Sequence, residues 1–156
     1  MKISITRRTT GLFVGTGIAA ILAGGVLSAF SAKSPTTLAM WASAYLVLVV
    51  GVAQVCFGLS LEQLAKKSRA AVIYWVFGLF NLGNMLVILG SVVKYSDLDW
   101  NMSLTLLGST SLVVSLVLLG GVIHQAAKSQ LRAMLYTTIV LLVLCIPIGI
   151  ILAQMS

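Results

Sequence analysis

Five long apolar runs fill most of this 156-residue chain, and the short segments between them carry nearly all of its charge. The runs cover approximately residues 11–31, 38–60, 70–93, 102–123 and 133–154. Each can cross about 30 Å of hydrocarbon as an α-helix. Because apolar residues run continuously rather than alternating, the pattern predicts helices and not barrel strands. We therefore predict an all-α integral membrane bundle of five transmembrane helices, forming a single domain over residues 1–156.

The composition excludes an ordinary soluble globule. Hydrophobic residues make up 60% of the chain and charged residues only 8%, whereas roughly a quarter of the residues in an average soluble domain are charged. A soluble fold of this length could not cover so much apolar surface. The bilayer is therefore the expected solvent.

The distribution of lysine and arginine predicts the orientation, because cytoplasmic loops are enriched in both. With a cytoplasmic N-terminus, the inner side holds Lys2, Arg7, Arg8, Lys66, Lys67, Arg69, Lys128 and Arg132, and the outer side holds Lys33 and Lys94. This arrangement puts the C-terminus outside and is typical of a plasma membrane or a bacterial inner membrane. All the inner basic residues from Arg7 onwards are expected to contact anionic lipid headgroups. They are divided among three short segments, which does not favour nucleic acid as a partner.

The first apolar run has an alternative interpretation as a cleaved signal peptide. Arg7 and Arg8 precede it, and the tract Ala29-Phe30-Ser31-Ala32 near its end has the small residues of a cleavage site. The run is long for a signal peptide, which favours a retained first helix.

Small residues recur along this first helix. Thr16, Ala20, Gly24, Ser28 and Ala32 follow one another at strict four-residue spacing, and Gly11, Gly15, Ala19 and Ala23 form an adjoining row. Small side chains let helix backbones approach closely in a membrane. The pattern predicts a tightly packed face, which serves either packing within this bundle or association with itself or a partner.

Polar side chains within the second and third runs are expected to face the interior of the bundle. Gln54 shares a side with small residues, and Tyr74, Asn81 and Asn84 lie along one stripe. Their depths make a hydrogen bond between Gln54 and Tyr74 geometrically reasonable. These groups serve either as interhelical hydrogen bonds or as the polar lining of a solute path.

Two further features concern the last two runs. The hydroxyls of Ser109, Thr110, Ser111 and Ser115 are expected to bond to their own helix backbone. Pro147 predicts a kink in the last run, because it removes a backbone hydrogen bond. A weak repeat at an offset of 62 residues would also relate the second and third runs to the fourth and fifth.

Reactive groups are scarce. No acidic or basic residue lies within the apolar runs, which argues against proton-driven transport. His124 is the only histidine, and the chain contains no recognisable catalytic, nucleotide-binding or metal-binding motif. We therefore expect no enzyme activity, no cofactor and no metal. The favoured function is a non-catalytic subunit or interaction partner in a membrane complex. The alternative is a small solute transporter or channel that works as an oligomer lined by the amides.

Overall fold

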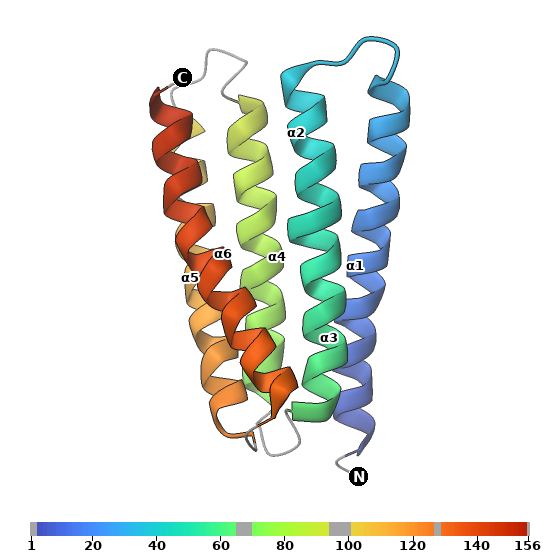
Figure 1. Ribbon diagram of the computed structural model, residues 1–156, viewed down its shortest axis with the longest axis vertical. Coiled ribbons are helices and arrows are strands. Elements are labelled where there is room, and N and C mark those ends of the chain that lie inside the picture. Colours follow the sequence, from blue (N-terminus) through green and yellow to red (C-terminus); the bar gives the residue numbers. More distant parts are fainter. Residues whose placement is uncertain (1–2, 65–69, 94–100, 127–128, 156) are drawn as a thin grey trace. The chain divides into compact units, whose positions relative to one another are not determined.

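The structure is a computed structural model that describes residues 3–64, 70–93, 101–126 and 129–155 (Figure 1). The side chains of residues 3–7, 101 and 147–155 lie outside the described part, as does the environment of Pro147. The described residues form helices joined by short connections and contain no strand. Their contacts divide the chain into two compact units, Met1–Gln63 and Leu64–Ser156. The prediction of one domain stays a prediction.

Four helices in the described residues are long and apolar enough to cross a membrane: Arg8–Ser31, Thr37–Leu64, Ala70–Val93 and Met102–His124. A further helix has a shorter described apolar part, Gln130–Ile146. The all-helical prediction and four of the five predicted candidate spans are therefore confirmed at this level.

The first unit consists of two long helices that lie side by side (Figure 1). α1 covers Ile3–Ser31. The second helix is formed end to end by α2 (Thr37–Tyr45), η1 (Leu46–Val52) and α3 (Ala53–Leu64). Thr36 caps its beginning, because the Thr36 hydroxyl accepts a hydrogen bond of 3.2 Å from the backbone nitrogen of Ala39.

The middle of this second helix is a π-helix. The backbone N–H of Ala53 bonds to the carbonyl of Leu48, five residues earlier, in place of the usual four. A π turn therefore contains one residue more than an α turn. The segment contains Gly51, whose backbone packs closely against α1.

The second unit contains three helices: α4 (Ala70–Val93), α5 (Asn101–His124) and α6 (Gln130–Met155). α4 and α5 pack along their lengths, and α6 packs on α5. Ser129 caps the start of α6, since its hydroxyl accepts a hydrogen bond of 3.2 Å from the backbone nitrogen of Arg132. The core of the unit includes Leu112, Leu116 and Leu119, which are almost fully buried on one side of α5.

Candidate functional site

The two helices of the first unit meet through glycines. A Cβ atom added to Gly17 would lie 2.8 Å from the carbonyl oxygen of Gly51. One added to Gly24 would lie 2.8 Å from the carbonyl oxygen of Ser43, and one added to Gly58 would lie 2.9 Å from the Cβ of Phe13. A Cβ at any of these positions would force a neighbouring atom to move, so the two helices approach closely at backbone carbonyls beside Gly17 and Gly24 and at the Phe13 side chain beside Gly58.

A hydrogen bond between polar side chains lies in the same contact. The Thr16 hydroxyl is 2.8 Å from Oε1 of Gln54, to which it can donate, and also lies 2.7 Å from the backbone oxygen of Leu12. Gln54 is fully buried. The structure thus places Gln54 in a helix contact and gives it Thr16, a residue of the predicted packing face, as a hydrogen-bond partner. A buried amide satisfied across two helices is typical of an interhelical hydrogen bond within a membrane.

Only part of the predicted small-residue face is buried in the structure. Thr16 is partly buried, and Ala20 and Gly24 are buried, whereas Ser28 and Ala32 are exposed. The adjoining row of Gly11, Gly15, Ala19 and Ala23 is exposed along its whole length. A Cβ added to Gly11 or Gly15 would meet no atom within 4 Å.

The polar residues predicted to lie on one stripe of the third run also differ in burial. Asn84 is buried, Asn81 is partly buried, and Tyr74 is exposed. The Nδ2 atoms of both asparagines donate hydrogen bonds of 2.8 Å to carbonyls four residues earlier in α4, Phe77 for Asn81 and Phe80 for Asn84. Gln54 and Tyr74 belong to different units. The hydrogen bond between them stays a prediction.

A polar contact that the sequence did not predict joins α4 and α5. The Ser111 hydroxyl donates to the carbonyl of Leu79 and the Ser115 hydroxyl donates to the carbonyl of Val76, both at 2.9 Å. The expectation that these hydroxyls bond only within their own helix is therefore wrong for both serines. It holds for Thr110, whose hydroxyl donates to Leu106 at 2.9 Å.

Two glycines explain why these serines reach the neighbouring helix. A Cβ on Gly83 would lie 2.8 Å from the carbonyl oxygen of Gly108, and a Cβ on Gly108 would lie 2.8 Å from that of Gly83. Backbones this close bring carbonyls within reach of a short hydroxyl. The spacing of Gly108, Ser111 and Ser115 at intervals of three and four residues was the available signal for this face.

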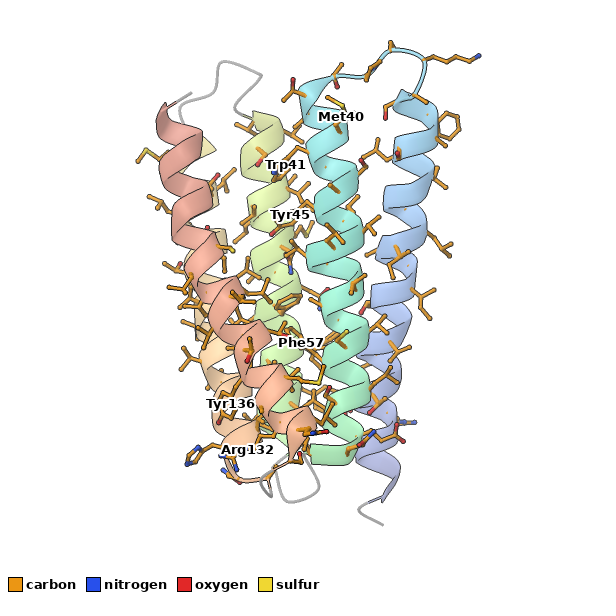
Figure 2. The ribbon with its side chains drawn as sticks, in the orientation of Figure 1. Met40, Trp41, Tyr45, Phe57, Arg132 and Tyr136 are labelled. Carbon is orange, nitrogen blue, oxygen red and sulfur yellow. The ribbon has the colours of Figure 1, made fainter. Side chains whose placement is uncertain are left out.

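A further polar group lies where α5 ends and α6 begins. Figure 2 shows Arg132 near the beginning of α6 and Tyr136 one turn further along. Nη1 of Arg132 donates a hydrogen bond of 2.7 Å to the carbonyl of Ala126, and its Nη2 lies 3.5 Å from Nδ1 of His124. The Tyr136 hydroxyl donates to the carbonyl of Gly120 at 2.9 Å. We call Arg132, His124 and Tyr136 the hairpin cluster.

The predicted lipid-contacting residues are only partly described. Arg8 is exposed and Arg132 is partly buried. Lys66, Lys67, Arg69, Lys128 and the side chain of Arg7 lie outside the described residues.

Within the described part of the chain, no three histidine, cysteine or acidic residues gather as metal ligands would. Cys56 and Cys145 are both exposed and free. The Thr10 hydroxyl is buried without a hydrogen-bond partner, which is costly by roughly 1–3 kcal/mol in a typical protein interior.

Comparisons with known proteins provide no family for this chain: no family model, no curated protein and no solved structure matches it.

Proposed function

We propose that this chain is a multi-pass membrane protein that acts as a non-catalytic subunit or interaction partner in a membrane complex. In this proposal all five helices cross a plasma membrane or bacterial inner membrane, with the N-terminus in the cytoplasm and the C-terminus outside. α6 is then the fifth span.

The proposal is supported mainly by polar side chains that form hydrogen bonds between the apolar helices. Thr16 and Gln54 hold α1 against the second helix, and Ser111 and Ser115 hold α5 against α4. Such bonds are worth on the order of 0.6–2 kcal/mol each in membrane bundles. A chain that uses its hydroxyls and amides to join helices is well suited to packing and offers few groups for chemistry.

The aromatic residues support the proposed positions of the membrane boundaries. Trp41 and Tyr45 lie on α2, near the end of the second helix that the charges assign to the outer side, and their rings stack with centroids 5.0 Å apart (Figure 2). Tyr136 lies near the opposite, inner end of α6. Tryptophan and tyrosine are enriched at both membrane boundaries because their rings are amphipathic.

The exposed row of Gly11, Gly15, Ala19 and Ala23 is the first surface on which to test for a partner helix. Substitution is informative there, because Gly15 is exposed and a Cβ added to it meets no atom within 4 Å. Gly25 provides a matched control, since it is an exposed glycine of the same helix that lies off this row and is equally unobstructed.

We predict that the tagged chain, extracted in mild detergent, migrates with a different membrane protein in a fixed ratio. The Gly15→Leu variant should reduce that partner by about tenfold, the effect of removing roughly 1.4 kcal/mol of helix packing. The Gly25→Leu variant should retain it. Size-exclusion chromatography and quantitative mass spectrometry measure both ratios.

Two results would contradict the proposal. Equal retention of the partner by both variants would show that this row does not bind it. Migration as a homo-oligomer that conducts a solute after reconstitution would favour the alternative, an oligomeric transporter or channel. In that alternative Gln54, Asn81 and Asn84 line the path. Their hydrogen bonds, to Thr16 for Gln54 and to their own helix for both asparagines, do not favour it.

A further inference from the structure

We propose that the hairpin cluster of Arg132, His124 and Tyr136 binds the phosphate group of an anionic phospholipid headgroup. The inference rests on the membrane insertion given under the proposed function, and it is independent of the role as a subunit. It also goes beyond a general attraction of basic loops to lipid, because it assigns one site with defined donors.

The Arg132 side chain is held in place before any ligand arrives. Nη1 donates to the carbonyl of Ala126 at 2.7 Å, and the guanidinium carbon lies 5.6 Å from the centre of the Tyr136 ring. The Tyr136 ring is itself fixed by the hydrogen bond of its hydroxyl to Gly120. An arginine restrained in this way loses less conformational freedom when it binds an anion than a free surface side chain does.

The remaining donors of the cluster suit a phosphate. A guanidinium has five N–H groups and accepts no hydrogen bond, so only part of its capacity is used by Ala126. Nη2 of Arg132 lies 3.5 Å from Nδ1 of His124, which places the imidazole beside the guanidinium. The His124 side chain is exposed. Arginine binds phosphate oxygens through two parallel hydrogen bonds.

No internal carboxylate balances this charge in the described residues of the second unit. The chain has only three acidic residues: Glu62 belongs to the first unit, and Asp97 and Asp99 lie outside the described residues, in the connection from α4 to α5. Arg132 also lies in the first turn of α6, where the helix dipole disfavours a cation and attracts an anion. A bound anion would balance the charge of Arg132 and would also interact favourably with the dipole of α6.

The surroundings favour a lipid over free phosphate as the occupant. Met134 lies two residues after Arg132 in α6 and is 69% exposed. Val140 and Leu141, further along the same helix, are more than half exposed. These apolar side chains need acyl chains beside them in a membrane. A phospholipid supplies the phosphate at the cluster and the acyl chains along α6 in the same molecule.

The test uses the purified full-length protein in detergent, with dioleoyl-phosphatidylglycerol or dioleoyl-phosphatidylcholine added, and native mass spectrometry to count bound lipids. Arg132→Gln should weaken phosphatidylglycerol binding by about tenfold, the contribution of one ordinary hydrogen bond to a charged group. Arg8→Gln is the matched control, since Arg8 is an exposed arginine of the other unit. It should change binding by less than about twofold.

Arg132→Gln also removes the hydrogen bond to Ala126, so folding is monitored by circular dichroism. If this variant loses helix content, Arg132→Lys and His124→Gln decide the question, and each should weaken phosphatidylglycerol binding without changing helicity. Equal losses in the Arg8 and Arg132 variants would overturn the proposal in favour of diffuse attraction. Displacement of the lipid by excess inorganic phosphate would assign the site to the free anion instead. Failure of membrane insertion would be recognised separately in cells, where Lys33→Cys and Ser129→Cys would then show the same labelling by a membrane-impermeant maleimide.

Discussion

At the residue scale, the helix contacts depend on glycines at which two backbones meet. Gly83 and Gly108 each occupy the space that a Cβ of the other would need, and Ser111 and Ser115 bond across the resulting gap. The contact runs antiparallel, since residue numbers rise on α5 as they fall on α4. Packing and polar bonding in this contact are therefore coupled.

Substitution of Gly83 should separate the two helices. A Cβ there would lie 2.7 Å from Cγ of Leu112 and 2.8 Å from the Gly108 oxygen. We expect Gly83→Ala to reduce the free energy of unfolding by about 1–3 kcal/mol, the usual effect of overpacking. Unfolding by sodium dodecyl sulfate in detergent, followed by circular dichroism, measures the change.

The matched control is Gly78→Ala in the same helix, where an added Cβ meets nothing within 4 Å. It should be neutral or stabilise by up to about 1 kcal/mol, because alanine is the better helix former. If both variants were equally stable, the close backbone contact would not exist.

Sequence reasoning placed individual residues on faces, but it paired Gln54 with Tyr74 and did not pair Gln54 with Thr16. It directed Gln54 inward and put Thr16 on a packing face, yet the bond between them depends on the relative rotation of two helices. It also assigned Ser111 and Ser115 to their own helix, because nothing in α5 alone shows that the α4 backbone lies within reach.

At the element scale, the predicted face on α1 differs from the observed one because of helix geometry. A row spaced at four residues turns by about 40° at each step around a helix with 3.6 residues per turn. By Ser28 the row has turned by roughly 120° from Thr16, and Ser28 is exposed. Ala32 is also exposed and lies beyond the end of α1 at Ser31. The close contacts recur instead at seven-residue spacing, at Gly17 and Gly24, which keeps them on one side of the helix.

Helix ends were predicted best where charges bound an apolar run. The span 70–93 agrees with α4, which follows Arg69 and precedes Lys94. α1 begins at Ile3 rather than near residue 11, since a helix can continue beyond hydrocarbon into the polar boundary. The π-helix η1 was not predicted, because no local pattern distinguishes its apolar residues from an α-helix.

Removal of one residue from the π-helix should be tolerated. Without Val52, the hydrogen bond from Ala53 to Leu48 would close an ordinary α turn, and α2 and α3 would keep their faces towards α1. We expect the deletion to change the free energy of unfolding by less than about 1 kcal/mol. The same detergent unfolding assay measures it.

Deletion of Leu22, an exposed residue of the regular helix α1, is the comparison. It rotates Gly17 relative to Gly24 by about 100° and should cost roughly 3 kcal/mol or more. If the two deletions reduced the free energy of unfolding by similar amounts, the π turn would contain no surplus residue.

At the scale of the whole molecule, charge and apolar length together make the central claim of five crossings. Four helices are long and apolar enough by themselves, whereas the described apolar part of α6 is shorter. The number of crossings therefore depends on α6, and so does the side on which the C-terminus lies.

Labelling of single cysteines with a membrane-impermeant maleimide in intact cells tests this claim most directly, after Cys56 and Cys145 have been replaced by alanine. The variants are Lys33→Cys, Ser129→Cys and Ser156→Cys. Five crossings predict that Lys33→Cys and Ser156→Cys are labelled from outside, and that Ser129→Cys is labelled only after the membrane is permeabilised. Labelling of Ser156→Cys only after permeabilisation, like Ser129→Cys, would contradict the account, because α6 would then not cross the membrane.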